Sequence, residues 1–153
     1  MHPKLAIVES TIHGILSPLG FKKQKLVWRR AVPDMLQMVG LDKKTYGYPD
    51  YNFHYGLFLS RYSEDPRPPV HEAHVQWSIA EKLPTVDDRS RLFPALRMNH
   101  DMPDESRVAA VRELIQAYVL PAFAATDTID KLREVLKDYK NPFCTWLTSF
   151  ETI

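Results

Sequence analysis

The chain has 153 residues, of which 44% are hydrophobic and 25% charged, and its formal net charge is +1. This length suits one globular domain with a substantial core, and we expect a single domain over residues 1–153. Residues 1–76 carry a net charge of +3 and residues 77–153 one of −2, a bias too small to indicate a nucleic-acid or membrane partner.

The cellular location is constrained by the cysteine content and by the N-terminus. Cys144 is the only cysteine, so no internal disulfide can form, which favours a reducing compartment. Residues 1–4 lead directly into an amphipathic pattern, without the apolar block and cleavage site of a secretory signal. No apolar run approaches the roughly 20 residues that span a bilayer. We therefore expect a cytoplasmic protein without a membrane partner.

The first predicted element is a helix. Its hydrophobic residues recur every three or four positions, which places them on one helical face. Pro18 disfavours helical geometry at Ser17, and Gly20 can adopt the left-handed conformation after the last turn. The helix should therefore end near Ser17. Its apolar stripe consists of Leu5, Val8, Ile12, Ile15, Leu16 and Leu19.

The following segments change to the alternating period of β-strands. Strands are predicted at residues 26–30, 35–41, 51–60 and 75–79, with a turn at 31–34. Residues 42–50 contain a glycine and a proline and are predicted as a loop, and three prolines interrupt residues 64–69. One face of the third strand should carry Phe53, Tyr55, Leu57 and Leu59, and the other Asn52, His54, Gly56 and Phe58.

Helices are predicted again in the C-terminal half. A helical turn at residues 89–96 is followed by a helix that begins at residues 101–104, with Asp101 as its cap and acids in its first turn. Pro121 should kink or end this helix. Further helices are predicted at residues 129–139 and 143–150. The stripe of the long helix comprises Val108, Val111, Ile115 and Tyr118.

These elements predict an α+β fold. The N-terminal helix packs on one face of a four-stranded antiparallel meander sheet, and the C-terminal helices join it there. Alternation in the third and fourth strands fits a sheet with one covered face. The opposite face, or the loop at residues 42–50, is then free to bind a partner.

Three histidines invite comparison with a metal site. His71 and His74 are three residues apart, and His54 on the neighbouring strand could supply a third ligand. The spacing is not that of a metalloprotease helix, and a pair of loop histidines without metal is the simpler interpretation. We therefore assign no metal and no cofactor.

Tyrosines are concentrated near the predicted loop. Tyr46, Tyr48 and Tyr51 lie on or beside it, and tyrosine is enriched at protein interfaces because it offers a large contact area with few torsions to fix. Alternate strand aromatics more often fill a core. The predicted partner surface combines the tyrosines with a polar strand face, and consists of Tyr46, Tyr48, Tyr51, Asn52, His54, His74 and Gln76.

A basic run surrounds Trp28. Such charge can bind phosphates, but the neutral balance of the chain and the lack of a glycine-rich loop favour a solvated strand face. Cys144 lies among aromatic residues without a nearby histidine, and the chain contains no G-x-S-x-G motif, so we assign no catalytic residue. The basic run is Lys22, Lys23, Lys25, Arg29 and Arg30.

Several landmarks together resemble a known family. They are the Leu-Gly-Phe-Lys-Lys ending of the first helix at residues 19–23, a Trp- and Arg-rich strand, Gln37 in the next strand, residues 52–56 of the third strand, and the Leu-Pro-Ala-Phe run at residues 120–123. Over residues 5–136 the chain resembles domain of unknown function 4304 (DUF4304). The family has no assigned activity, and some relatives look like immunity proteins paired with bacterial toxins.

The resemblance implies binding rather than catalysis. The leading hypothesis is a non-enzymatic protein, of bacterial immunity type, that neutralises a cognate toxin by direct contact. One alternative is a small metal-dependent or small-molecule enzyme that uses His54, His71 and His74. The other is a single-stranded nucleic-acid binder, whose affinity would depend strongly on salt.

Overall fold

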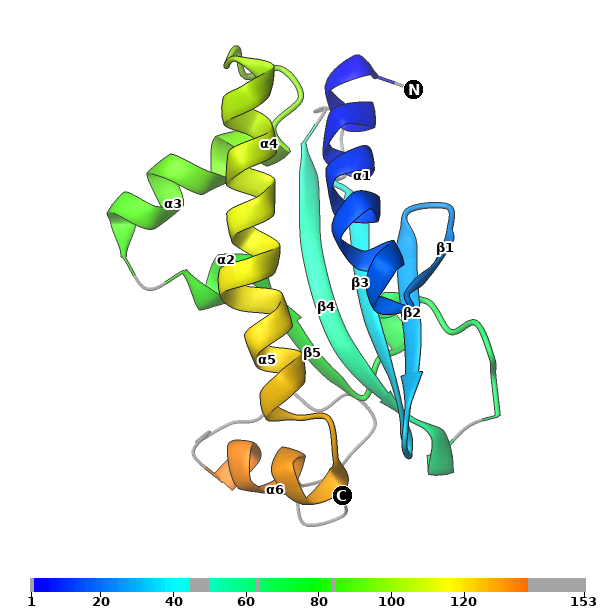
Figure 1. Ribbon diagram of the computed structural model, residues 1–153. Coiled ribbons are helices and arrows are strands. Elements are labelled where there is room, and N and C mark those ends of the chain that lie inside the picture. Colours follow the sequence, from blue (N-terminus) through cyan, green and yellow to red (C-terminus); the bar gives the residue numbers. More distant parts are fainter. Residues whose placement is uncertain (1, 45–49, 63, 84, 138–153) are drawn as a thin grey trace.

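The computed structural model describes residues 2–44, 50–62, 64–83 and 85–137 (Figure 1). Its centre is a five-stranded antiparallel sheet whose strands follow one another in chain order. The strands are β1 (Lys22–Gln24), β2 (Val27–Val32), β3 (Met35–Lys43), β4 (Tyr51–Leu59) and β5 (Val75–Ser78). The helices are α1 (Pro3–Leu16), α2 (Ile79–Lys82), α3 (Val86–Leu92), α4 (Asp104–Glu113), α5 (Leu120–Ala125) and α6 (Ile129–Lys137). This arrangement confirms the predicted α+β meander.

The prediction of four strands was wrong by one. The additional strand β1 pairs with β2, with Lys22 opposite Arg29 and Gln24 opposite Val27, and a two-residue turn joins the two strands. Lys25 in this turn has a positive φ of 55°. All three residues of β1 are exposed and polar, so they show no alternation that a sequence pattern could detect.

The N-terminal helix follows the prediction closely. α1 ends at Leu16, a single 3₁₀ turn covers Ser17–Leu19, and Gly20 takes the left-handed conformation with a φ of 92°. The chain can therefore reverse directly into β1. The buried residues of α1 are Leu5, Val8, Ile12 and Leu16.

α1 and the helix formed by α4 and α5 lie over the same face of the sheet (Figure 1). Pro121 was predicted to kink or end this helix, and it does not end it. A π-helical segment, Leu114–Val119, precedes α5 and places Pro121 in its first turn, where a missing N–H costs little. By length and composition the helix at Asp104–Ala125 could span a membrane, but its apolar stripe packs into the core.

A buried arginine holds the segment that precedes α4. Arg107 is 0% exposed, and its guanidinium donates hydrogen bonds to the carbonyl oxygens of Ala95 at 2.6 Å and His100 at 2.8 Å. Burial lowers the pKa of this guanidinium, while Asp104 and Asp101 raise it. Because an arginine stays protonated, these bonds are charge-assisted and fix the turn between Phe93–Leu96 and α4.

The face of the sheet away from the helices is partly covered. The prediction that this face is free to bind a partner therefore holds for only part of it. Residues 64–74, called the flap below, cross this face. Val70 lies over Gly40 and Ala73 over Gly56, and a second small core forms there. Its buried members are Met38, Phe58, Val70 and Ala73.

The flap can approach closely because two sheet residues lack side chains. A Cβ added at Gly56 would lie 2.4 Å from the carbonyl oxygen of Val75 and 3.1 Å from the Cβ of Ala73. We predict that Gly56→Ala lowers the free energy of unfolding by about 2 kcal/mol, since neither neighbour can yield without moving backbone. Urea denaturation would measure this change.

A matched control is Gly14→Ala in α1, where nothing lies within 4 Å of the added methyl group. This substitution should raise the free energy of unfolding by roughly 0.5–1 kcal/mol, because alanine suits a helix interior better than glycine. Equal unfolding midpoints for the two variants would contradict the close packing of Gly56 against β5 and the flap.

Candidate functional site

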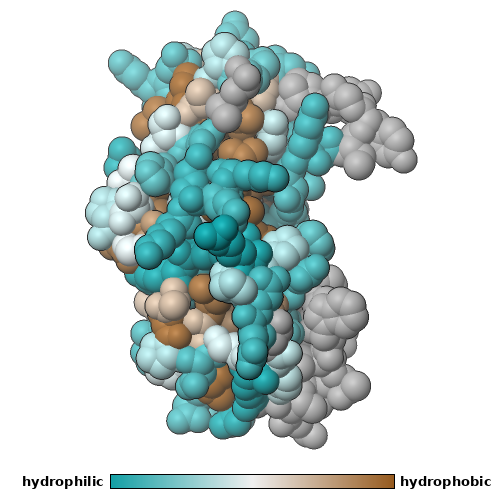
Figure 2. Space-filling model, turned by 90° about the vertical axis from the view of Figure 1, so that its right-hand side faces the viewer, coloured by the Kyte–Doolittle hydropathy of each residue, from teal (hydrophilic) through white to brown (hydrophobic). Residues whose placement is uncertain are grey.

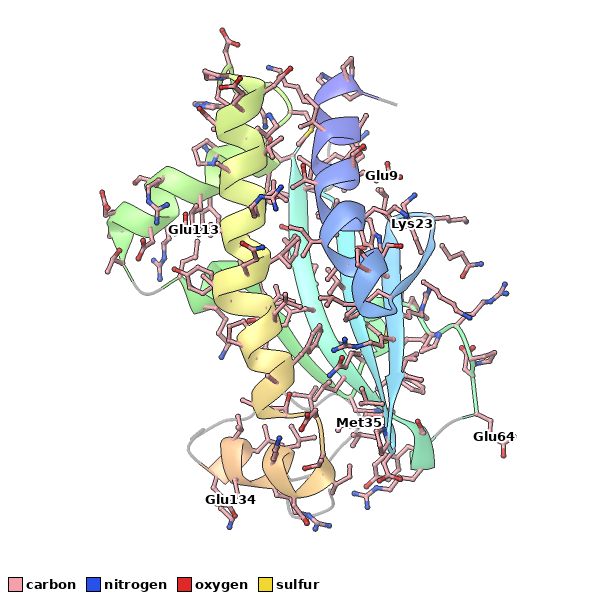
Figure 3. All side chains as sticks on the ribbon, viewed as in Figure 1. Glu9, Lys23, Met35, Glu64, Glu113 and Glu134 are labelled. Carbon is pink, nitrogen blue, oxygen red and sulfur yellow. The ribbon has the colours of Figure 1, made fainter. Side chains whose placement is uncertain are left out.

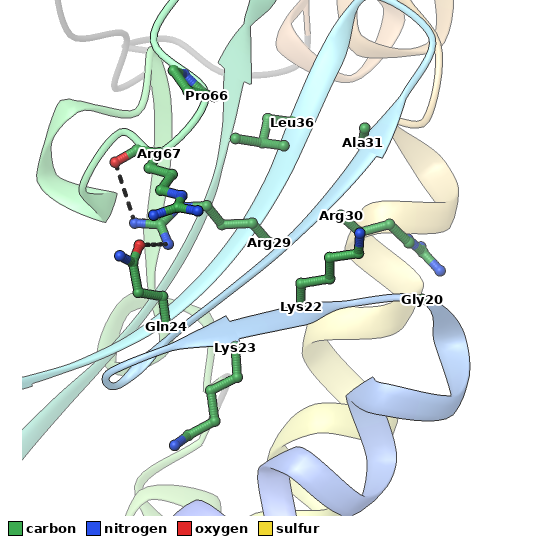
Figure 4. A pocket seen from close by; sticks show the side chains of 10 residues that line it. All are labelled: Gly20, Lys22, Lys23, Gln24, Arg29, Arg30, Ala31, Leu36, Pro66 and Arg67. Atoms are coloured by element: carbon green, nitrogen blue, oxygen red, sulfur yellow. Dashed lines mark hydrogen bonds between the residues drawn. The ribbon is translucent and has the colours of Figure 1, made fainter.

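A cleft opens between the β1–β2 hairpin and the flap. It has a volume of about 760 Å³. Figure 4 shows its lining side chains, and Figure 2 shows that hydrophilic residues dominate the side of the molecule that faces right in Figure 1, which includes the β1 edge. The lining residues are Gly20, Lys22, Lys23, Gln24, Arg29, Arg30, Ala31, Leu36, Pro66 and Arg67.

Two of the five basic residues at the cleft, Lys23 and Arg30, have partners on the side of the sheet that faces the helices. Lys23 forms an ion pair with Glu9 of α1, and these side chains lie together in Figure 3. Arg30 turns away from Arg29 (Figure 4) and donates from Nε at 2.9 Å and Nη2 at 2.7 Å to Oε1 of Gln37. Their charges contribute to the local field, but their donors are already engaged.

Arg30 also explains part of the sequence motif at residues 19–23. Its Nη1 donates to the carbonyl oxygen of Leu19 at 2.9 Å, and its guanidinium lies 4.5 Å from the centroid of the Phe21 ring. Gln37 is 0% exposed and therefore contacts no partner. These landmarks connect the end of α1 to the sheet, and their role is structural.

The remaining cations of the cleft are Lys22, Arg29 and Arg67. Lys22 and Arg29 are directly opposite each other on paired strands, so both project from the face away from the helices. Arg29 donates to the carbonyl oxygen of Pro68 from Nε at 3.0 Å and Nη2 at 2.8 Å. Its Nη1 lies 3.5 Å from Oε1 of Gln24. Arg29 therefore holds the flap against the hairpin and forms one wall of the cleft.

The electrostatic environment of Arg29 is mixed. Burial lowers the pKa of its guanidinium, the carboxylate of Asp65 raises it, and the neighbouring Arg67 lowers it. A guanidinium nevertheless remains charged at neutral pH. Lys22 and Arg67 are exposed and form no ion pair with any residue that the structure describes. The cleft thus presents positive charge that the described part of the chain does not neutralise.

The sequence-predicted partner surface is only partly assembled. Tyr46 and Tyr48 lie outside the described residues. Tyr51, Asn52 and His54 are half-buried along β4, and Nε2 of His54 is 3.7 Å from Oδ2 of Asp42. Asn52 and His54 share the face away from the helices, and His54 is opposite Gly40, over which Val70 of the flap lies.

His74 and Gln76 hold the flap, and of the two only His74 is buried, whereas Gln76 is half-buried. His74 is 5% exposed, and its Nδ1 accepts the N–H of Leu59 at 2.8 Å. Nε2 of Gln76 donates to the carbonyl oxygens of His71 at 2.8 Å and Ala73 at 3.0 Å. The burial of His74 does not fit its assignment to an open partner surface, and the amide of Gln76 is engaged by the flap.

The histidines do not assemble into a metal site in the described part of the chain. No group of three or more His, Cys, Asp or Glu side chains there is placed to hold a metal ion. His74 has one ring nitrogen engaged by Leu59, and His71 is exposed on the 3₁₀ turn of the flap.

Sequence reasoning missed Arg67 and Gln24 as site residues, and it interpreted Lys22 and Arg29 as a solvated face. Arg29 and the carbonyl oxygen of Arg67 are 38 residues apart in sequence and meet only through the docked flap. The proline-rich stretch marked a break in secondary structure, but no pattern in it indicated where the chain would pack.

The fold and site define a class: an antiparallel meander backed by helices on one face, with a cationic cleft on the other. Comparison with protein families identifies the family. The family model described as domain of unknown function (DUF4304) matches residues 12–125. The chain belongs to this family. No curated protein and no solved structure gives a significant match.

The buried histidine predicts a pH dependence of stability. Burial lowers the pKa of His74 below its usual value of about 6.5. The unfolded chain therefore takes up a proton at a higher pH than the folded chain. We expect the free energy of unfolding to be highest above pH ~6.5 and to fall as the pH drops from there through the lower, folded-state pKa.

This slope should disappear in His74→Gln, whose amide oxygen can still accept the Leu59 N–H but does not titrate. His71→Gln, which changes an exposed histidine of the same segment, is the matched control and should retain it. Denaturant unfolding between pH ~5 and ~8 measures the slopes. Parallel curves for the wild-type protein and His74→Gln would rule out this role.

Proposed function

We propose that the protein is a non-enzymatic binding protein of immunity type, which neutralises a cognate protein toxin by direct contact. The observation that carries the proposal is the cationic cleft on the face that the helices leave uncovered. Arg29 is fixed there by the buried carbonyl of Pro68, so the cleft is preorganised for recognition.

The chemistry of the cleft favours binding over catalysis. Its polar lining consists of ammonium, guanidinium and amide groups, and none of the described residues that line it offers an imidazole, carboxylate, thiol or hydroxyl. Such a lining can hold a charged group in place. A lysine can act as a base or a nucleophile only when its amine is neutral, and the described lining offers no imidazole or carboxylate that would take up its proton.

The contact surface extends beyond the cleft. A stable protein interface covers about 800 Å² on each partner, which is more than one cleft provides. Asn52 and His54 lie half-buried on the same face of the sheet, and Tyr51 lies on the same strand. These three residues are called the margin below. The cleft and this margin together could cover an active site on a partner.

The proposal predicts a stoichiometric complex with a protein that is toxic by itself. Tagged protein would be captured from lysate of its native host, and a co-purifying partner would be expressed with and without this chain. We expect the chain to restore growth and to form a complex of fixed stoichiometry. A partner that is harmless alone, or a lack of any complex, would contradict the proposal.

The margin can be tested with the double variant Asn52→Lys/His54→Glu. Because both residues are half-buried on the proposed contact surface, we expect its Kd to rise by about tenfold or more, which corresponds to roughly 1.4 kcal/mol. Arg112→Glu on the exposed side of α4 is the control and should bind as the wild type does. Isothermal calorimetry on the purified pair measures the constants. Equal affinities for the two variants would remove the margin from the interface.

A further inference from the structure

We propose that the cleft binds an acidic segment of polypeptide, whose aspartate or glutamate carboxylates are held by Lys22 and Arg67 beside the fixed positive charge of Arg29. The inference deepens the proposed function by naming the chemistry of the partner, and it rests on that function only for the partner's identity. Figure 4 shows the anchors: Arg29 and Arg67 approach each other from the hairpin and the flap, and Lys23 points to the other side of the hairpin.

The anchors are placed by independent parts of the fold. The strand register puts Lys22 beside Arg29, and the Pro68 carbonyl oxygen fixes the Arg29 guanidinium at 2.8 Å. Arg67 reaches the same space from the flap, and its own carbonyl oxygen lies 3.5 Å from Nη2 of Arg29. A guanidinium can bind a carboxylate through two parallel hydrogen bonds, and Arg67 donates no hydrogen bond from its side chain to a described residue.

The nearest acid leaves this charge in place. Asp65 interacts electrostatically with Arg29, and its Oδ1 accepts the backbone N–H of Arg67 at 2.9 Å. This carboxylate therefore orders the flap, while Lys22 and Arg67 form no ion pair with a described residue. Two guanidinium groups held near each other repel, and a bound carboxylate would relieve that repulsion.

The shape and the apolar lining favour a peptide over a nucleic acid. Leu36, Ala31 and Pro66 also line the cleft beside the charged groups, and a peptide can pack aliphatic side chains against them (Figure 4). None of the described lining residues is aromatic, so the cleft has no platform on which bases would stack. The volume of about 760 Å³ falls in the usual range of ligand sites and suits a few side chains.

The test uses synthetic probes, since it requires no knowledge of the partner. A fluorescent peptide of about ten residues, alternating glutamate and serine, spans roughly 30 Å when extended. A peptide with glutamine in place of glutamate is the uncharged control, and oligo-dT of similar length represents nucleic acid. Fluorescence anisotropy with the full chain gives each Kd, at ~0.05 M and at ~0.3 M salt.

We expect the glutamate peptide to bind more tightly than the glutamine peptide, and to weaken at the higher salt. Arg67→Glu and Lys22→Glu, both at exposed positions, should each raise its Kd about tenfold. Arg112→Glu changes the net charge equally at a distant exposed site and should leave the Kd unchanged. Circular dichroism would confirm that the variants remain folded.

Three results would overturn the inference. They are no binding of the glutamate peptide, equal effects of Arg67→Glu and Arg112→Glu, or tighter binding of oligo-dT that the cleft variants abolish. The outcome is separable from the proposed function. A chain that binds the peptide but captures no toxin would contradict only the function, and a chain that neutralises a toxin but binds no acidic peptide would contradict only the cleft.

Discussion

The contacts of Arg30 hold together the part of the sheet that carries the cleft. Its guanidinium joins the carbonyl oxygen of Leu19, the Phe21 ring and the buried amide of Gln37, and so ties the end of the first helix to two strands. Charge-assisted bonds in a partly buried site are stronger than neutral ones, and Gln37 would lose its partner without them. Gly20 turns the chain between these anchors, so Arg30 helps to position β1, whose pairing with β2 then places Lys22 opposite Arg29.

The flap contributes the second half of the cleft, and its position is determined from several directions. Two glycines let it approach the sheet, His74 accepts a backbone N–H from β4, and Arg29 binds the carbonyl oxygen of Pro68. None of these contacts is local in sequence. A segment without regular secondary structure through most of its length is thereby held firmly enough to carry Arg67 into a defined place.

The parts of the fold that could be predicted are those in which hydrophobic residues recur at a regular spacing. The stripe of α1 and the alternation in β4 were enough to assign the helix, the meander and its buried face. Alternation cannot tell what covers the opposite face, so His74 and Gln76 were taken for partner residues when they hold the flap. β1 was too short and too polar to show any pattern, and nothing in sequence links Arg67 to the hairpin. The assignment of Tyr46 and Tyr48 to an interface stays a prediction.

The net charge of the chain argues against long-range attraction of a charged partner, whereas the charge of the cleft favours binding at short range. A net charge of +1 produces little long-range attraction, so steering of an extended polyanion is not expected from this protein. At short range the attraction is stronger, because the strand register and the docked flap bring Lys22, Arg29 and Arg67 together beside apolar side chains. Recognition then depends on geometry within about one Debye length, ~8 Å at physiological salt. A short acidic segment on a folded partner satisfies that condition, whereas a uniform phosphate backbone would gain little from so local a group of cations.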